Sequence, residues 1–235
     1  MVNGQSPAQA RRPEAVAFDV NETLTDLTPL TEVFAGFGLE DTALRWWFAV
    51  LLRDGLALAA AGDAATFGDL AVIALDEVAA ASGRVLPKGS GHELVDAFGR
   101  VPVHPDVSPA LHRLQAAGVP AFALTNGSAP LTRRILDAAG VVDAFADVLS
   151  VDAVRHWKPR PEPYRYAAEV AGVPPDRLAL VAVHPWDLHG AASAGLSTGW
   201  VNRDGRTYPS VFRQPTVRSA DLDGVVEQLL ALEST

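Results

Sequence analysis

The feature that most constrains this chain is a short apolar run at residues 15–18 that ends in Asp19. A run of this length is typical of a buried strand. In an open parallel sheet, the carboxyl ends of the strands form the edge where ligands bind. An Asp that closes a strand can also cap a helix or form a turn, but at this edge its carboxylate is placed for chemistry. The run therefore predicts that Asp19 lies at a binding edge.

Strand-like and helix-like segments alternate over most of the chain, which favours a parallel sheet in an α/β fold. The pattern predicts strands at residues 15–19, 120–125, 147–150, 179–183 and 198–201. It predicts helices at residues 106–118, 129–139, 161–172, 187–195 and 222–233. The fold class is therefore an α/β, Rossmann-like parallel-sheet core.

A second region lacks strand-like runs and predicts helices only, at residues 30–37, 42–61, 66–82 and 90–98. We interpret residues 28–100 as an all-helical segment, here called the cap, inserted after the first strand. The core is then formed by residues 14–27 and 101–235, and residues 1–13 are expected to be a flexible N-terminus. A cap matters because it can close a pocket over Asp19 and exclude water.

Three further polar segments follow predicted elements of the core. The second strand ends in Thr125 and Asn126, which open an Asn-Gly turn. Residues 156–164 read His-Trp-Lys-Pro-Arg-Pro-Glu-Pro-Tyr, with Lys158 before a proline. A third apolar run at residues 178–183 is followed by His-Pro-Trp-Asp-Leu-His-Gly-Ala at residues 184–191. Each segment alone is also typical of an ordinary turn or a solvated surface.

Together, in this order, the four segments resemble the haloacid dehalogenase superfamily. Its phosphatases carry Asp-x-Asp-x-Thr, but here Asn21 replaces the second Asp, and an amide cannot protonate an alkoxide. Val183 stands where those phosphatases have a magnesium ligand. The segment from Trp186 and Asp187 to Gly-Ala is similar to that of the type II L-2-haloacid dehalogenases, which use no metal.

This resemblance implies a metal-independent, two-step hydrolysis of a short 2-haloalkanoic acid, with no cofactor. Asp19 would displace the halide and form an ester, which water would hydrolyse to the 2-hydroxy acid. Lys158 would hold Asp19 ionised, because a nearby opposite charge favours the charged carboxylate. Asp187 would pair with Lys158 and position or deprotonate the water. His184 would either act as the base for that water or merely cap the strand end.

The resemblance also implies where a substrate binds. Its carboxylate would contact Thr125, Asn126 and the amides that open the following helix, a favourable place for an anion. We assign Asn21 and Trp186 to the same expected pocket.

The resemblance identifies the helical insertion as the family's cap, and the roof of the pocket is expected in its second helix. Trp46 and Arg53 are seven residues apart and would share a helix face. Arg45 and Arg53 are competing candidates for receiving the halide, and the aromatic residues of this helix are equally consistent with a buried cap core.

The composition limits the remaining classes. With 235 residues, of which 49% are apolar, the chain can bury a core and carry an insertion. It contains no Cys, which excludes disulfides and Cys-based zinc sites. A net charge of −9 without basic runs argues against nucleic acid. The sequence shows no signal-peptide pattern and no long apolar span, so we expect a cytoplasmic protein without a membrane partner.

Two other function classes stay open. A magnesium-dependent phosphatase of the same superfamily is opposed by Asn21 and Val183. A catalytically idle binding protein is opposed by the retention of Asp19, Lys158 and Asp187, because buried charges are costly to keep. The expected partner is a small haloacid or a similar carboxylate, and a homodimer stays open.

Overall fold

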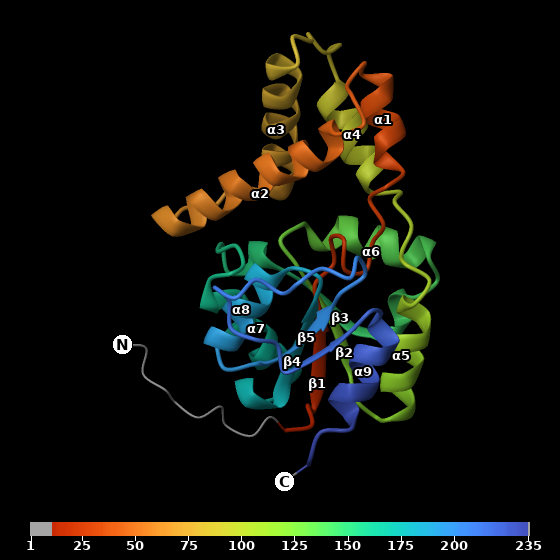
Figure 1. Cartoon of the computed structure of the whole chain (residues 1–235), viewed down its shortest axis with the longest axis vertical. Coiled ribbons are helices and arrows are strands. Elements are labelled where there is room, and N and C mark those ends of the chain that lie inside the picture. Colours follow the sequence, from red (N-terminus) through yellow and green to blue (C-terminus); the bar gives the residue numbers. More distant parts are fainter. Residues whose placement is uncertain (1–10, 235) are drawn as a thin grey trace.

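A single six-stranded parallel sheet forms the centre of the computed structural model, which describes residues 11–234 (Figure 1). The strands are β1 (Ala15–Phe18), β2 (Ala121–Thr125), β3 (Phe145–Ser150), β4 (Leu178–Ala182), β5 (Ser197–Val201) and β6 (Val217–Ser219). The predicted α/β class is confirmed. Five strands were predicted; β6 was missed because three residues that include Arg218 do not form an apolar run. Of the predicted flexible N-terminus, residues 1–10 lie outside the described residues.

The strand order places β1 in the middle of the sheet, as β3-β2-β1-β4-β5-β6. The chain first builds one side of the sheet from β1 and later returns to build the other side. A point where the strand order reverses in this way leaves a crevice at the carboxyl ends of the strands. Asp19, the residue after β1, therefore stands at the switch point of the sheet.

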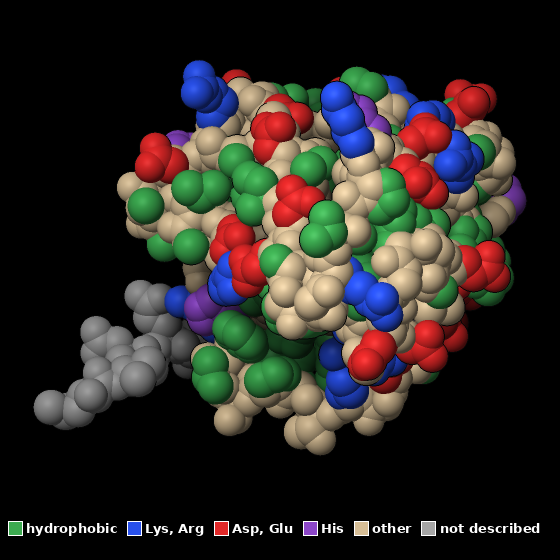
Figure 2. All heavy atoms as spheres, turned by 90° about the horizontal axis from the view of Figure 1, so that it is seen from above, with side chains coloured by type: hydrophobic (Ala, Val, Ile, Leu, Met, Phe, Trp, Pro, Cys, Tyr) green, Lys and Arg blue, Asp and Glu red, His purple; other side chains and the backbone are tan. Residues whose placement is uncertain are grey.

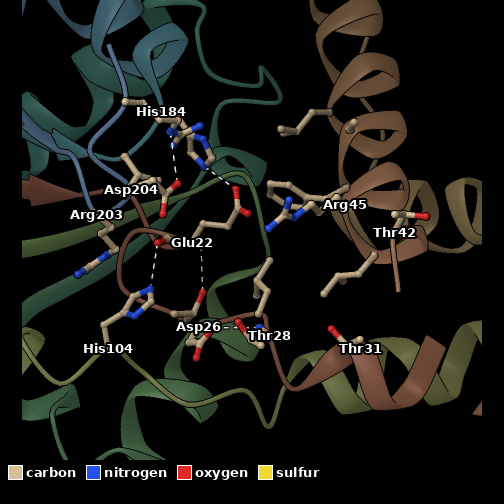
Figure 3. Close-up of a pocket in the computed structure, with 18 of the residues that line it drawn as sticks. Glu22, Asp26, Thr28, Thr31, Thr42, Arg45, His104, His184, Arg203 and Asp204 are labelled. Carbon is tan, nitrogen blue, oxygen red and sulfur yellow. Dashed lines mark hydrogen bonds and ion pairs between the residues drawn. The ribbon is translucent and has the colours of Figure 1, made fainter. Parts of the chain in front are cut away.

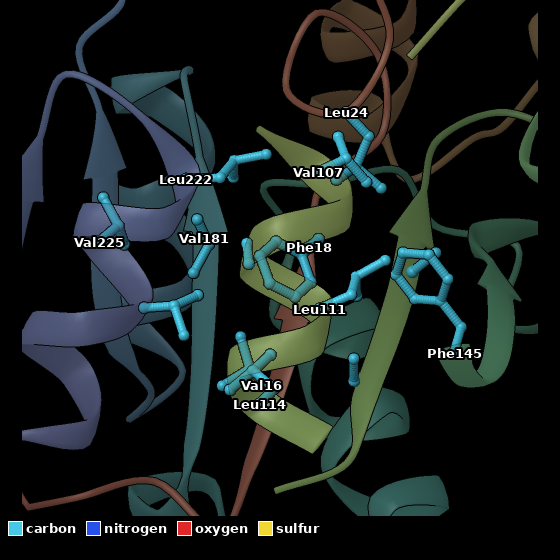
Figure 4. Close-up of a cluster of buried hydrophobic side chains, with 14 of the residues drawn as sticks. Val16, Phe18, Leu24, Val107, Leu111, Leu114, Phe145, Val181, Leu222 and Val225 are labelled. Carbon is cyan, nitrogen blue, oxygen red and sulfur yellow. The ribbon is translucent and has the colours of Figure 1, made fainter. Parts of the chain in front are cut away.

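Helices cover both faces of this sheet. They are α5 (Val107–Ala116), α6 (Ala129–Ala138), α7 (Pro161–Ala171), α8 (Pro185–Ser193) and α9 (Leu222–Leu230), with short 3-10 helices at Val142–Ala144, Val151–Ala153 and Pro175–Arg177. In β1, Val16 and Phe18 pack with the α5 and α9 side chains on one face (Figure 4). Ala15 and Ala17 pack with α7 and α8 on the other face. This alternation is that of a strand buried on both sides.

Four helices stand above the carboxyl edge of the sheet (Figure 1). They are α1 (Leu30–Gly36), α2 (Ala43–Ala61), α3 (Phe67–Ala81) and α4 (Ser90–Phe98), and no strand lies between residues 28 and 100. They share a hydrophobic cluster that includes Phe34, Trp47 and Leu75. The predicted helical segment is thus present. The same cluster also includes Trp157 from the core, so the division at residues 28 and 100 stays a prediction.

Trp157 joins the helical segment to the core. Its ring is buried, and its indole N–H donates to the Ala65 carbonyl over 3.0 Å. A Cβ atom on Gly55 of α2 would lie 2.4 Å from this ring, so only glycine permits the close packing. This contact fixes α2 over the segment that contains Lys158.

None of the helices described over residues 11–234 has both the length and the apolarity that a membrane span requires.

Candidate active site

Asp19 is held at the end of β1 by donors on both carboxylate oxygens. Lys158 Nζ lies 2.7 Å from Oδ1, and the Thr23 hydroxyl donates to Oδ2 over 2.7 Å. The residue is only 4% exposed. Burial by itself would raise the pKa of Asp19, but the charges of Lys158 and His184 and the hydrogen bonds from Lys158 and Thr23 hold it below its ordinary value. The carboxylate is therefore ionised and fixed in orientation.

Lys158 is a fully buried cation with three acceptors. Its Nζ donates to Asp19 Oδ1, to Asp187 Oδ2 over 2.7 Å and to the Leu124 carbonyl over 3.0 Å. These contacts use all three of its N–H donors. Burial would lower the pKa of Lys158, but the two carboxylates outweigh burial and raise it. The predicted neighbourhood of Asp19, Lys158 and Asp187 is what the structure shows.

Asp187 lies in the first turn of α8 and has no exposed atoms. While Oδ2 accepts from Lys158, Oδ1 accepts from the Tyr164 hydroxyl over 2.6 Å. Gly190 allows this approach, since a Cβ there would lie 2.6 Å from the same hydroxyl. Burial raises the pKa of Asp187 against the opposing charge of Lys158. Both oxygens of Asp187 are thus committed to buried partners.

The loop after β1 is fixed from several sides. Thr23 Oγ1 accepts from the Val183 N–H over 3.1 Å, and the Thr23 carbonyl accepts from Arg203 over 2.9 Å. Glu22 has a φ of +62°, a region that non-glycine residues rarely adopt. A ring nitrogen of His104 lies 3.2 Å from the Glu22 carbonyl. These contacts hold the backbone beside Asp19 in a strained but defined shape.

His184 directs one ring nitrogen at three oxygens. Its Nε2 lies 3.2 Å from the Asn21 carbonyl, 3.5 Å from Glu22 Oε2 and 3.8 Å from Asp19 Oδ2. The ring stacks on Trp186 with 5.2 Å between centroids. Because each oxygen is an acceptor, Nε2 must carry a hydrogen in this orientation. This nitrogen therefore acts as a donor.

A cleft of about 910 Å³ opens between the loop after β1 and helix α2 (Figure 3). The core side contributes charged side chains, among them Glu22, Asp26, His104, His184 and Arg206. The cap side is mostly apolar and is formed by Leu44, Arg45, Phe48, Ala49 and Leu52. These positions of α2 lie three to four residues apart, or beside one another, on one helix face. The cleft can hold a small molecule with one apolar and one charged side.

Acidic and basic side chains are interspersed on the face seen from above the helical segment (Figure 2). Since the net charge is −9, this surface offers an anion no long-range attraction. Attraction of an anionic substrate must therefore come from cations inside the cleft, such as Arg45.

The structure places the predicted pocket residues of the core deeper than expected. Thr125 Oγ1 accepts from the Gly127 N–H over 2.8 Å, and Asn126 Oδ1 accepts from the Lys158 N–H over 3.0 Å. Both residues are buried and do not line the cleft. Asn21 is also buried and presents its carbonyl to His184. Contacts of these three residues with a substrate stay a prediction.

The predicted cap residues separate into two groups. Arg45 lines the cleft, as expected for a candidate that receives the halide. Arg53 does not: its guanidinium pairs with Asp54 and Glu77, both at 2.7 to 2.8 Å, on the exposed surface. Trp46 is 42% exposed and borders a different cavity, of about 300 Å³. Trp46 and Arg53 point away from the cleft because they lie outside the face of α2 that forms the cleft wall.

Val183 occupies the position that resembles a metal ligand in the phosphatases, but its side chain is apolar; its backbone N–H donates to Thr23 and its carbonyl accepts from the Trp200 indole. Across residues 11–234, no three His, Asp or Glu side chains are grouped so that they could bind a metal ion. The metal-independent reaction stays a prediction.

Three residues of the site were not singled out from the sequence. Tyr164 belongs to the segment at residues 156–164, and its spacing from Lys158 could have identified it as a site residue. Glu22 follows Asn21 directly, and its charge close to Asp19 in the sequence could have identified it as a site residue. Arg203 contacts Thr23 across 180 positions of the chain, for which a single sequence gives no signal.

A buried, ionised Asp at the switch point of a parallel sheet, beneath a helical layer, defines an enzyme with a carboxylate nucleophile. The sequence profile of the haloacid dehalogenase-like hydrolases matches residues 13–195. The chain belongs to this family, and the predicted superfamily is confirmed.

Several similar proteins are 2-haloacid dehalogenases. The chain is 28% identical over 219 residues to the (S)-2-haloacid dehalogenase H-109 of Pseudomonas putida, covering 92% of this chain and 98% of that protein. It is 27% identical over 217 residues to the haloacetate dehalogenase H-2 of Moraxella sp. (strain B), covering 91% and 96%. The structure of the L-2-haloacid dehalogenase RSc1362 has a TM-score of 0.86 at 27% identity, covering 93% and 99%. The predicted branch of the superfamily is supported by these relatives.

Proposed function

We propose that this protein hydrolyses the carbon–halogen bond of a short 2-haloalkanoic acid through an ester on Asp19. One observation carries the proposal: the Asp19 carboxylate is ionised and held by Lys158 and Thr23 beside the cleft. Asn21, at the position of the phosphatase acid, has no proton to give, which suits a leaving group that needs none. The 2-haloacid dehalogenases among the relatives support the same reaction.

The first step is a displacement at carbon. Asp19 Oδ2, on the side of His184, attacks C2 of the substrate, and the carbon–halogen bond breaks as the halide leaves with its electron pair. Lys158 stays on Oδ1 and keeps the carboxylate aligned for attack. Arg45 lines the opposite wall of the cleft, and in this proposal it receives the departing halide.

The second step is hydrolysis of the ester. Water attacks the Cγ atom of Asp19, and negative charge develops on Oδ1. Lys158 Nζ, already hydrogen-bonded to that oxygen, stabilises this charge without rearrangement. Collapse of the intermediate breaks the bond between Cγ and the ester oxygen and releases the 2-hydroxy acid.

The substrate carboxylate requires donors of its own. Thr125 Oγ1 accepts from Gly127, which leaves its hydroxyl hydrogen for an acceptor. The amides that open α6 lie next in the chain, and a helix N-terminus favours an anion. We keep these groups, with Asn126, as the proposed carboxylate site. The assembly as a homodimer also stays a prediction.

The test measures halide release from chloro-, bromo- and fluoroacetate and from both enantiomers of 2-chloropropionate. The reactions contain EDTA, and Asp19→Asn is the matched control. We expect release that survives EDTA and is absent in the variant. Single turnover in oxygen-18 water should then place the label in Asp19. Release that needs magnesium, or turnover of phosphate esters in its place, would replace this proposal with a phosphatase.

A further inference from the structure

We propose that Arg203 is a positioning residue for the displacement step and that it acts on the nucleophile through Thr23. The inference rests on the proposed function and adds to it a group that works from outside the reacting atoms. Arg203 follows β5 by two residues and lines the core side of the cleft, beside the loop after β1 (Figure 3).

The contact that carries the inference is a hydrogen bond to the backbone of Thr23. Arg203 Nη2 donates to the Thr23 carbonyl over 2.9 Å. The hydroxyl of the same threonine donates to Asp19 Oδ2 over 2.7 Å and accepts from the Val183 N–H over 3.1 Å. Oδ2 is the oxygen assigned to the attack on C2. The place of Thr23 therefore decides how this oxygen faces the substrate.

Asp106 fixes the orientation of Arg203. Its Oδ2 lies 2.7 Å from Nη1 and its Oδ1 lies 3.1 Å from Nη2, so the two groups form a fork of two parallel hydrogen bonds. Oδ2 also accepts from the N–H of Leu222, the first residue of α9, over 2.8 Å. The two side chains are 22% and 16% exposed, so salt screens this pair less than a surface pair. The guanidinium is thus held in one plane.

The fork lies where the chain leaves the core and returns to it. The two connections to the helical segment run side by side, and Thr25 in the first forms an antiparallel bridge with Val103 in the second. Arg203 contacts the first connection ahead of this bridge, at Thr23, and the second beyond it, at Asp106. It therefore holds the loop of the nucleophile against movement of either connection.

Arg203 is poorly placed to bind a substrate itself. Both terminal nitrogens are already engaged with acceptors of the protein. Its Nε is buried and has no acceptor within residues 11–234, so the cleft does not reach that hydrogen. A buried donor without an acceptor is unfavourable, and stability alone would not favour this arrangement. A role in holding Thr23 accounts for it.

Loss of Arg203 should change the alignment of the nucleophile rather than substrate affinity. Lys158 would still hold Asp19 Oδ1, but the loop that contains Thr23 would be free to shift beside Oδ2. A displacement of about 1 Å at a reacting group can slow a reaction by about 10²-fold. The effect should appear in the rate of ester formation at saturating substrate. The substrate concentration that gives half this rate should stay unchanged.

The experiment measures the burst of halide that accompanies ester formation, by rapid quench at several concentrations of 2-chloropropionate. In Arg203→Met we expect a burst slower by about 10–100-fold with an unchanged half-saturating concentration. Arg113→Met is the matched control, because Arg113 forms a similar fork with Asp223, both contacts at 2.7 Å, between α5 and α9 at the surface. Its burst should be normal. Urea denaturation verifies that both variants fold.

A double variant tests whether Arg203 acts through Thr23. Two residues that act as one unit have non-additive effects. On a Thr23→Val background, which lacks the hydroxyl, Arg203→Met should therefore slow the burst little further. Asp106→Asn weakens the same fork and leaves Arg203 in place. It should also slow the burst, and it serves as the test if Arg203→Met does not fold.

Three results would overturn the inference. They are a normal burst in a folded Arg203→Met or Asp106→Asn, equal slowing with and without the Thr23 hydroxyl, and a change confined to the half-saturating concentration. The last would make Arg203 a substrate-binding residue. Wild-type protein that releases no halide would refute the proposed function itself, a result distinct from these three.

Discussion

Two regions of this molecule contain the same kinds of charged group within a few ångströms of each other and use them differently. In the buried cluster of Asp19, Lys158 and Asp187, both ion pairs are 2.7 Å long and every side chain is almost fully buried. In the cleft, Glu22 and His184 lie 3.5 Å apart, and the Glu22 side chain is nearly half exposed.

The difference shows how burial divides the chemistry. Charges without water must stay paired, because a lone buried charge is strongly unfavourable, so the cluster has one stable geometry. It can hold a nucleophile, but its groups cannot readily exchange protons with water. The groups of the cleft contact solvent and are free to move a proton. Nucleophile and proton acceptor are therefore expected in different regions.

The largest effect should follow from breaking the buried cluster with Lys158→Met. The variant leaves two buried carboxylates unpaired, and removing one partner of such a pair lowers the free energy of unfolding by about 3–5 kcal/mol. Halide release should fall by at least about a hundredfold, because the donor to Asp19 Oδ1 is lost. Urea denaturation and halide assays measure both. Lys88→Met, in an exposed turn, is the control and should change neither. Unchanged stability of Lys158→Met would show that the cluster does not depend on its cation.

The second prediction separates the two regions by pH. The pKa of Asp19 is lowered, so its carboxylate stays ionised in mild acid, whereas that of Glu22 is raised, so it takes up a proton at higher pH. As the pH falls through the range just above the ordinary Glu pKa of 4.5, Glu22 should become neutral while Asp19 stays ionised, so ester hydrolysis should slow while ester formation continues.

Single-turnover kinetics at each pH would resolve the two steps. Besides Asp19 and His184, the charged groups that act on Glu22 are Arg206 and Asp204 at the edge of the cleft. Replacing either should shift the acid limb of hydrolysis and leave the burst in place. Equal slowing of both steps would contradict the division between the two regions.

A pair of cap arginines tests which face of α2 belongs to the cleft. Arg45→Ala should lower kcat/KM by about 10–100-fold, the range for losing a hydrogen bond to a charged group. Arg53→Ala removes a cation from the same helix but one that is engaged with Glu77 at the surface, and kcat/KM should not change. Steady-state halide release measures both variants. The reverse result would mean that α2 turns its other face to the substrate.

The smallest effect concerns the contact that joins the two regions. Gly55→Ala places a methyl group against the Trp157 ring, and such overpacking lowers the free energy of unfolding by about 1–3 kcal/mol. Trp157 precedes Lys158, so kcat should fall modestly as the cluster shifts. Thermal denaturation and halide assays check this, with Gly36→Ala, where a Cβ meets no neighbouring atom, as the control. An unaffected Gly55→Ala would show that α2 can shift away without loss.

Much of the fold and the buried cluster could be predicted because both depend on local patterns. Apolar runs gave five of the six strands, and each polar segment followed one of those runs or stood beside a predicted helix. Parallel strands bring their carboxyl ends to one edge, so Asp19, Thr125 and the segment after β4 had to meet there. Lys158 was assigned to the site from a sequence motif rather than from hydrophobic periodicity.

The cleft was less predictable because its walls depend on long-range packing. Helix α2 has apolar residues on most faces, so its sequence does not show which one is buried. Trp47 and Leu51 pack into the helical cluster, and this rotation puts Arg45 in the cleft and Arg53 outside it.

The sequence by itself therefore determined the parallel-sheet core, the helical segment above it and the nucleophile at the end of the first strand. Only the tertiary structure decided that Glu22 faces His184 and that Arg203 supports Thr23 across 180 positions. The physical reason is that sheet topology follows from hydrophobic periodicity along the chain. The direction of a side chain in a loop, or on a helix that is apolar on most sides, is set by which distant elements pack against it.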